Sequence, residues 1–208
     1  MIIQSKLLIN MLNYYSSAII IQKNIKKWLI KRKILIPSSF YQTKTWRKNR
    51  NWYKNGKFNE CEKYQINLIE KILKNKISKT PDRINIETLE ICSINHPMLL
   101  NNGYEYTENF DGKYENVYFN LKFICDNGGA QTRTLREVYH FIKSQMEFLI
   151  KKKQIFHFIN ILDGDTSFKN MDKFHYLKSN KKYKDIIKYI FIGDLHQFQN
   201  HFQEYIQQ

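Results

Sequence analysis

Residues 117–125 carry the clearest alternation of apolar and polar side chains in the chain. The odd-numbered positions from Val117 to Cys125 are all apolar, whereas Asn120 and Lys122 fall between them. Successive side chains of a β-strand point to opposite faces of the sheet, so this spacing predicts a strand. We expect its odd-numbered face to be buried, and we expect Asn120 and Lys122 to leave the sheet together on the other face.

A long amphipathic helix is predicted after this strand. Its apolar positions recur at intervals of three and four residues, which places them on one face of a helix. They are Leu135, Val138, Ile142, Met146 and Leu149. Thr134, followed three residues later by Glu137, matches a capping box and predicts that the helix begins there.

Two further strands are predicted after the helix. Residues 155–162, IFHFINIL, form a mostly apolar run typical of an interior strand. Asp163, Gly164 and Asp165 follow as a predicted turn, which we favour over a site role for Asp163. The shorter run YIFIG begins at Tyr189 and precedes a closing helix. Because strands alternate with helices, the expected fold class is α/β or α+β, with helices covering a sheet.

The N-terminal part of the chain has a helical pattern. Apolar side chains from Ile21 to Trp28 recur at intervals of three and four residues among lysines. This spacing predicts a basic amphipathic helix, which Pro37 ends. We therefore expect an N-terminal helical segment, residues 1–36, and one larger domain, residues 37–208.

Within the larger domain, a second amphipathic helix is predicted after a turn at Asn55 and Gly56. Its apolar positions on one face are Ile66, Ile69 and Leu73. Residues 80–108 show no sustained period and are expected to consist mostly of loops.

The charge of the chain adds a class of partner. The formal net charge of the 208 residues is +15, and 15% of them are aromatic. Such a balance favours partners that carry phosphate, and aromatic rings can stack on bases. Lysine, asparagine and isoleucine are all abundant, however, so coding bias could supply part of the charge. Charge alone therefore makes a nucleic-acid partner plausible but identifies no site.

Cysteine content and the N-terminal apolar residues bear on the compartment. The three cysteines are too few and too scattered for a disulfide framework, which favours a reducing compartment. Lys6, Asn10 and Asn13 interrupt the apolar N-terminus well before the roughly 18 residues that a membrane span needs. We therefore expect a soluble intracellular protein, in the cytoplasm or nucleus, without a membrane segment.

Candidate chemistry lies around the strand of residues 117–125. Hydrolysis of a phosphodiester needs a divalent metal and a group that positions the attacking water. Asp111 is the natural metal ligand and Lys122 the natural partner for water and phosphate, whereas Asn120 offers only a neutral carbonyl oxygen. The alternative interpretation is that Asp111 forms a turn with Gly112 and that Lys122 is a solvated strand residue.

The segment after the strand adds a candidate phosphate site. Gly128 and Gly129 let the backbone approach a ligand closely. Arg133 and Arg136 lie beside the predicted helix start, where the helix dipole disfavours cations by up to about 1 kcal/mol each. Their presence there is expected if a phosphate occupies the spot. Gln131 could contact a base edge or only hold the loop.

A basic and aromatic segment, residues 46–53, offers further contacts to DNA. Trp46, Trp52 and Tyr53 stand among its basic side chains. The basic residues that we expect to contact phosphates are Arg47, Lys48 and Arg50.

Four motifs together resemble the core of type II restriction endonucleases of the PD-(D/E)xK nuclease superfamily. They are FDG (110–112), NLK (120–122), GGAQTRTLREVYHFI (128–142) and FINILDGD (158–165). The resemblance runs from about residue 104 to residue 203, with residues 41–74 as a preceding basic helical part. It implies a restriction-endonuclease-like mixed sheet flanked by helices, and a cut of double-stranded DNA with Mg²⁺ or Mn²⁺, often by a homodimer.

The resemblance also implies roles for individual residues. Asp111 corresponds to the metal-binding aspartate and Lys122 to the lysine of the motif, whereas Asn120 takes the place of the usual acidic residue. An asparagine removes one negative metal ligand. The carboxylates that could replace it are Glu108, which we place in the site, and Asp126, Glu70 or Glu90. Without a replacement, the metal site should be weaker, and the alternative hypothesis is an inactive DNA-binding protein on the same fold.

The N-terminal helix resembles an IQ motif, the helical segment that binds calmodulin-like proteins. The positions that carry the resemblance are Ile21, Gln22, Lys26, Trp28 and Lys31. Lys27 stands where the motif usually has glycine. The resemblance implies a calmodulin-like partner and a third functional hypothesis, a regulatory protein that acts through this helix. Packing against the larger domain or lying along DNA are the alternatives.

Overall fold

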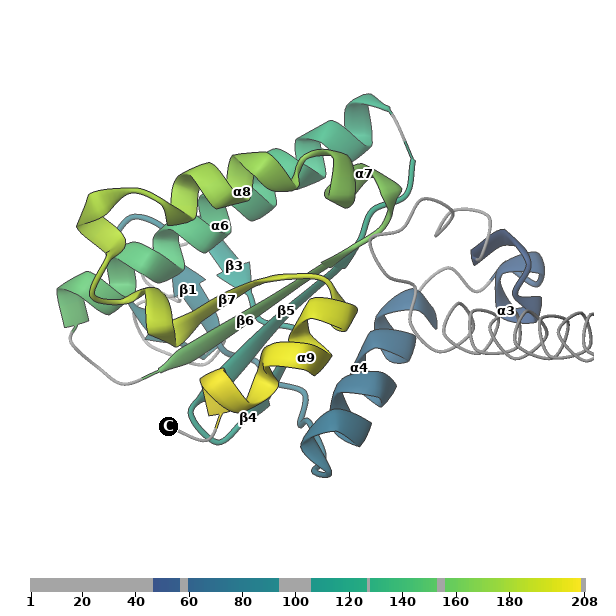
Figure 1. Cartoon of the computed structure of the whole chain (residues 1–208), viewed down its shortest axis with the longest axis horizontal. Helices are drawn as coiled ribbons and strands as arrows, with labels where there is room; N and C mark the ends of the chain where they lie inside the picture. Colours follow the sequence, from purple (N-terminus) through teal and green to yellow (C-terminus); the bar gives the residue numbers. More distant parts are fainter. Residues whose placement is uncertain (1–46, 57–59, 94–105, 127, 153–155, 207–208) are drawn as a thin grey trace, which may run out of the picture. The chain divides into compact units, whose positions relative to one another are not determined.

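The computed structural model describes residues 47–56, 60–93, 106–126, 128–152 and 156–206 (Figure 1). The predicted N-terminal helix, with the IQ-like positions Ile21, Gln22, Lys26, Trp28 and Lys31, lies outside the described residues, as does the division at residue 36. Both stay predictions. Within the described ranges, no helix is at once long and apolar enough to cross a membrane.

The main sheet has four strands in the order β4-β5-β6-β7. The strands are β4 (Gly112–Tyr114), β5 (Val117–Phe123), β6 (His157–Asp163) and β7 (Ile190–Gly193). β4 pairs antiparallel with β5, whereas β5, β6 and β7 run parallel. A parallel pair needs a crossover connection, and a helix supplies it between β5 and β6. The predicted mixed α/β class is therefore confirmed.

A smaller antiparallel sheet precedes the main one, in a region predicted to be mostly loops. Its strands are β1 (Arg83–Asn85), β2 (Ile91–Cys92) and β3 (Thr107–Asn109), in the order β2-β1-β3. β3 leads directly through Phe110 and Asp111 into β4. The small sheet thus places Asp111 at the junction between the two sheets.

Helices cover both faces of the main sheet (Figure 1). The helices of the described residues are α3 (Asn51–Lys54), α4 (Glu60–Leu73), α6 (Gly129–Lys152), α7 (Asp165–Lys169), α8 (Met171–Lys178) and α9 (Leu195–Ile206), with the 3-10 turns η1 (Lys181–Tyr183) and η2 (Ile187–Tyr189). α6 and α8 pack on one face, and α4 and α9 contact β5 and β6 from the other.

The core between α6 and the sheet follows the predicted helical pattern. All five predicted apolar positions of α6, from Leu135 to Leu149, are buried. They pack with Tyr118 of β5 and Phe158 of β6, whose ring centroids lie 6.0 Å apart. Full burial of one such side chain stabilises a fold by about 1.5–3 kcal/mol. This face is therefore a main source of stability.

The predicted exposure of the even-numbered face of β5 is wrong. Tyr118 and Asn120 are as buried as Phe119 and Leu121 on the opposite face. The reason is that β5 lies between β4 and β6 in the sheet and has helices on both faces. The polar residue Asn120 in the alternating pattern therefore lies at a buried position and does not face solvent.

The predicted start of α6 is also wrong. The helix begins at Gly129, and the Thr134 hydroxyl donates to the backbone carbonyl of Ala130 at 3.1 Å instead of capping the helix. Such a bond to the preceding turn is a common alternative for threonine inside a helix. Arg133 and Arg136 consequently lie beyond the first turn, where the dipole argument for a bound phosphate no longer applies.

Candidate active site

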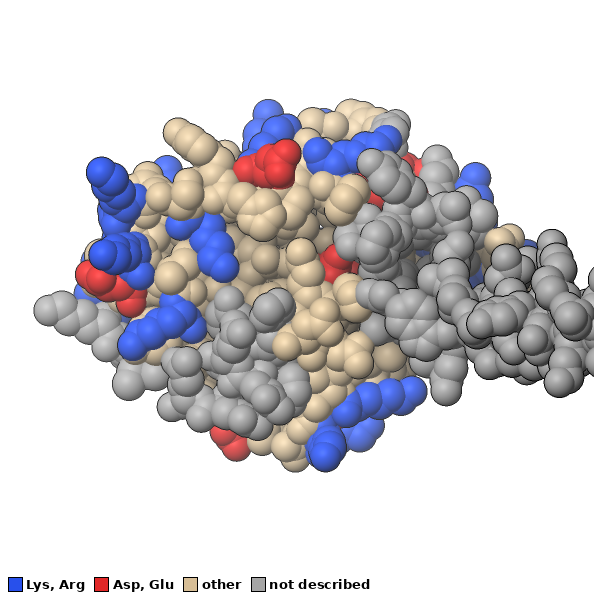
Figure 2. All heavy atoms as spheres, viewed as in Figure 1, with Lys and Arg blue, Asp and Glu red and all other residues tan. Residues whose placement is uncertain are grey.

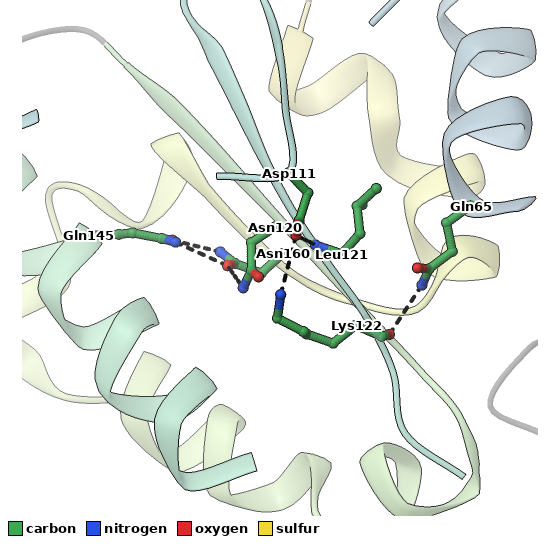
Figure 3. A network of polar contacts seen from close by, with 7 residues as sticks. All are labelled: Gln65, Asp111, Asn120, Leu121, Lys122, Gln145 and Asn160. Carbon is green, nitrogen blue, oxygen red and sulfur yellow. Dashed lines mark hydrogen bonds and ion pairs between the residues drawn. The ribbon is translucent and has the colours of Figure 1, made fainter. Parts of the chain in front are cut away.

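The hairpin of β4 and β5 brings Asp111 and Lys122 together. The register pairs Gly112 with Phe119, and the backbone amide of Asp111 donates to the Phe119 carbonyl at 2.9 Å. The Asp111 carboxylate oxygen Oδ2 then accepts the backbone amide of Leu121 at 2.6 Å and lies 3.3 Å from Lys122 Nζ (Figure 3). The antiparallel register thus explains why residues eleven apart in sequence meet.

The Asp111–Lys122 pair remains accessible. The side chain of Asp111 is 19% exposed and that of Lys122 is 30% exposed. Ion pairs that keep this much contact with water contribute about 0–1 kcal/mol to stability. A ligand or water can therefore reach both charges, and the backbone amide of Leu121 holds the carboxylate in place.

Asn120 contributes a buried oxygen beside this pair. Its side chain is only 1% exposed, and its Nδ2 donates to the Oδ1 of Asn160 at 2.9 Å. Its own Oδ1 is buried and has no hydrogen-bond partner among the described residues. Figure 3 shows this oxygen on the side of Asn120 that faces Asp111 and Lys122. A buried carbonyl without a partner costs about 1–3 kcal/mol, so the position is suited to a ligand.

Two glutamates lie within electrostatic reach of the pair. Burial raises the pKa of the Glu108 carboxyl on β3, with Glu137 and Asp111 adding to the shift and Lys122 opposing it. On α4, partial desolvation raises the pKa of the surface carboxyl of Glu62, and the Asp111 charge adds to that shift while Lys122 opposes it. Burial is the main cause of both shifts, and both carboxyl groups interact with the charges of Asp111 and Lys122.

The sequence pattern predicted Glu108 but missed Glu62. The signal for Glu62 was weak, because an acidic residue in the first turn of an amphipathic helix is ordinary. The other carboxylates considered as replacements pair elsewhere: Asp126 with Arg47, Glu70 with Lys76 and Glu90 with Lys152. Glu108 is therefore the predicted replacement that the fold brings toward Asp111.

The oxygen donors at this place fit a hard divalent cation in part. No three His, Cys, Asp or Glu side chains converge as metal ligands within the described ranges. Asp111 nevertheless offers a carboxylate, and Asn120 offers the amide oxygen that lacks a partner. Mg²⁺ is commonly held by one or two carboxylates together with substrate phosphates and several waters, so this donor set can supply part of its ligand shell.

The predicted DNA contacts at the start of α6 are at the surface. Gly128, Gly129, Arg133 and Arg136 are exposed, and Gln131 is half-buried. A Cβ added at either glycine would meet no atom within 4 Å, so close packing does not explain the glycines. The segment is therefore open to a large ligand.

The segment of residues 47–50 lies against the loop that precedes α6. Arg47 Nη2 is 2.8 Å from the Asp126 carboxylate, and the Arg47 side chain is 15% exposed. This ion pair indicates a structural role for Arg47, whereas Lys48 is exposed and Arg50 is half-buried. Figure 2 shows Lys and Arg side chains at separate places around the edge of the visible face, not in one patch.

Asp163 is the last residue of β6 and is fully buried, not part of a surface turn. Its carboxylate accepts Gln65 Nε2 of α4 at 2.8 Å and the backbone amide of Leu195 at 3.2 Å. Burial raises the pKa of Asp163 to about 8, although the Gln65 bond opposes the shift. The two hydrogen bonds of Asp163 therefore tie α4 and the start of α9 to the sheet.

The residue after Asp163 has to be a glycine. Gly164 has φ 109°, and a Cβ there would lie 2.1 Å from the Ile124 carbonyl oxygen.

Asp111, Asn120 and Lys122 thus form the centre of the candidate site, with Glu108 and Glu62 in their electrostatic surroundings. The case for this site depends on the chain's own geometry. Compared with known proteins, the chain matches no family model, no curated protein and no solved structure.

Proposed function

We propose that the chain is a Mg²⁺-dependent DNA endonuclease that hydrolyses phosphodiester bonds, similar to type II restriction endonucleases. The observation that carries the proposal is the 3.3 Å approach of Lys122 Nζ to the Asp111 carboxylate, beside the Asn120 oxygen that lacks a partner. Metal-assisted phosphodiester hydrolysis needs ligands for the metal and a group that positions the attacking water, and Asp111 with Asn120 and Lys122 can fill these two roles.

The fold gives further support to the proposal. The restriction-endonuclease resemblance implies a mixed sheet flanked by helices, and the chain has one. The FDG and NLK motifs lie on adjacent strands of that sheet, and the third motif opens α6. We take the restriction-endonuclease-like fold as the finer statement of the same proposal.

The proposed mechanism assigns one task to each group. Asp111 and the Oδ1 of Asn120 would hold the cation, with the Glu108 carboxylate nearby. When bound, the cation supplies charge that stabilises the pentacovalent phosphate. Lys122 donates hydrogen bonds to a phosphate oxygen and to the attacking water, because its ammonium group is partly exposed and held by Asp111. Water attacks phosphorus, the bond between phosphorus and the leaving oxygen breaks, and the proton that the water loses passes to solvent while the leaving oxygen takes a proton from solvent.

The test is cleavage of plasmid DNA by the full chain. With Mg²⁺ present we expect discrete fragments, and we expect Asp111→Ala to abolish them. The matched control is Asp82→Ala, because Asp82 also forms an ion pair with a lysine, Lys113, on the same sheet. If a well-folded sample cuts no DNA of any methylation state, with Mn²⁺ also tried, the proposed function is wrong.

A second candidate is a DNA-binding protein on the same fold without catalytic activity. The observation that favours it is the asparagine at position 120, which leaves one carboxylate fewer at the site. This candidate predicts salt-sensitive DNA binding without cleavage, and binding that barely changes in Asp111→Ala. Two further proposals are independent of these candidates. One is that the chain forms a homodimer, and the other is that residues 16–36 bind a calmodulin-like protein.

A further inference from the structure

A chain of three amides leads from the candidate site into the core. Asn120 Nδ2 donates to Asn160 Oδ1 at 2.9 Å (Figure 3). Asn160 on β6 and Gln145 on α6 then form two reciprocal bonds, from Asn160 Nδ2 to Gln145 Oε1 at 2.8 Å and from Gln145 Nε2 to Asn160 Oδ1 at 3.2 Å. All three side chains are buried.

A backbone carbonyl fixes the orientation of the Asn160 amide within this series of hydrogen bonds. Asn160 Nδ2 also donates to the carbonyl oxygen of Phe191 on β7 at 3.3 Å. A backbone carbonyl can only accept, so the amino group of Asn160 must face β7. Its Oδ1 therefore faces the other way and accepts from both Asn120 and Gln145. Both hydrogens and both lone pairs of Asn160 are then used.

The fixed direction determines which atom of Asn120 faces the site. A flipped Asn120 would place its oxygen against the Asn160 oxygen, at the place where the donor now lies 2.9 Å away. Two buried acceptors facing each other repel, and Asn160 Oδ1 would keep only its bond from Gln145, so losing the Asn120 bond costs about 1–3 kcal/mol. Asn120 therefore keeps its oxygen on the side of Asp111.

We infer that Asn160 and Gln145 are positioning residues that make the carbonyl oxygen of Asn120 a neutral ligand for the divalent cation at Asp111. The inference rests on the proposed function, because that function requires the cation. It also gives a reason for asparagine at position 120. A carboxylate there would face the Asn160 oxygen without a proton to donate, so the network fits an amide and not an acid.

The sequence carries a signal for both positioning residues. Asn160 interrupts the apolar run IFHFINIL, and Gln145 falls on the buried face of α6 beside Met146 and Leu149. Polar residues at buried positions need hydrogen-bond partners, so two of them on adjoining elements are expected to meet.

The first experiment measures Mn²⁺ binding to the full chain by calorimetry, in the absence of DNA. We expect Asn160→Leu to weaken binding by about 10- to 100-fold, which is the usual effect of removing a group that orients a ligand. Gln145→Leu should have a smaller effect in the same direction. The control is Ser144→Ala, which removes a buried hydroxyl from the same helix. Among the described residues, this hydroxyl donates to the His140 carbonyl.

A second experiment uses only the wild-type chain, so its outcome does not depend on whether a variant folds. In the wild-type chain, Mg²⁺ should shift the ¹³Cγ resonance of Asn120, while its Nδ2 protons stay hydrogen-bonded to Asn160. An unmoved ¹³Cγ, or Nδ2 protons that respond to the cation in its place, would overturn the inference.

The outcomes separate this inference from the proposed function. If the wild-type chain cuts DNA and Mn²⁺ binds Asn160→Leu as tightly as wild type, the positioning role is wrong and the nuclease proposal stands. If the wild-type chain binds no Mn²⁺ and cuts no DNA, the nuclease proposal fails and the inference fails with it.

Discussion

Two aspartate–lysine pairs of nearly equal geometry use lysines of the β4–β5 hairpin, with Asp82 just before β1 and Asp111 just before β4 as their partners. Lys113 Nζ is 3.1 Å from Asp82, with side-chain exposures of 33% and 19%. The Asp111–Lys122 pair has a separation of 3.3 Å and almost the same exposures. Distance and burial therefore do not distinguish a structural pair from a candidate active site.

The surroundings of the two pairs differ. The Tyr118 hydroxyl donates to Asp82 at 2.8 Å, and Lys113 Nζ lies 4.7 Å from the centre of the Tyr118 ring. Burial alone would raise the pKa of Asp82, yet hydrogen bonds from Tyr118 and Lys113 outweigh it and lower the pKa. The pair of Asp82 is thus satisfied by its neighbours.

The pair of Asp111 lies among groups that are not satisfied in this way. The Asn120 oxygen beside it lacks a partner within the described residues, and Glu108 and Glu62 add negative charge. Unsatisfied polar atoms and unbalanced charge are typical of sites that bind a ligand, because a protein that needs only stability would remove them. The comparison therefore supports the proposed function for the Asp111 pair and a stabilising role for the Asp82 pair.

The largest expected effect comes from removing each lysine charge while keeping side-chain length. Lys122→Met should lower the rate of DNA cleavage by on the order of 10²–10³-fold, because the developing charge loses its partner. Lys113→Met should leave the rate unchanged. Initial rates at saturating Mg²⁺ give the comparison, and equal losses in both variants would contradict it.

The second expected effect is on stability, and here removal of Asp82 should matter more than removal of Asp111. Asp82→Ala should lower the free energy of unfolding by about 1–3 kcal/mol, because the half-buried Tyr118 hydroxyl and Lys113 lose an acceptor. Asp111→Asn, which keeps an acceptor for the Leu121 backbone amide, should change it by no more than about 1 kcal/mol. Urea denaturation at pH 7 measures both values, and Tyr118→Phe serves as a control for Asp82.

A smaller effect is expected from the acidic surroundings of Asp111. Glu108→Gln and Glu62→Gln should each weaken Mn²⁺ binding by about tenfold, since they remove negative charge without changing shape. Glu70→Gln is the matched control, because the Glu70 carboxylate on the same helix as Glu62 pairs with Lys76. Equal affinities in all three variants would show that the excess charge has no part in cation binding.

The smallest expected effect is a pH dependence of stability that comes from Asp82. Its pKa is lower in the folded chain than in the unfolded one, so its contribution is present above about pH 4 and is lost as the pH falls through the folded-state pKa. Asp82→Asn should therefore flatten the acid side of the stability curve. Urea denaturation between pH 2 and pH 7 would detect this, and an unchanged curve would rule out the contribution.

Much of the fold could be predicted from the sequence. The apolar positions of α6, the interior strand β6 and the strand β7 followed from spacing and composition, and the structure confirms them. The start of α6 did not, because Thr134 and Glu137 fit a capping box by spacing and only the preceding turn shows that Thr134 is inside the helix.

The residues at the centre of the candidate site were predicted from the sequence, but the groups that surround them were not. Strand periodicity placed Asn120 and Lys122 on one face, and the resemblance added Asp111. Neither could show that Asn120 is buried, because burial depends on which strands flank β5 and which helices cover it. Glu62 was missed for a related reason: the packing of α4 against β5, which brings it into the electrostatic surroundings of Asp111, is a contact between distant parts of the chain.

The sequence by itself determined the elements, the class of fold and the chemical groups available at positions 111, 120 and 122. These follow from local spacing, since side-chain direction in a strand or helix depends on the neighbouring residues alone. Only the tertiary structure decided that Asp111 meets Lys122, that Asn160 turns the Asn120 oxygen toward them and that Asp82 forms a closed pair. Strand register and helix packing join residues that are distant in sequence, and no local pattern specifies them.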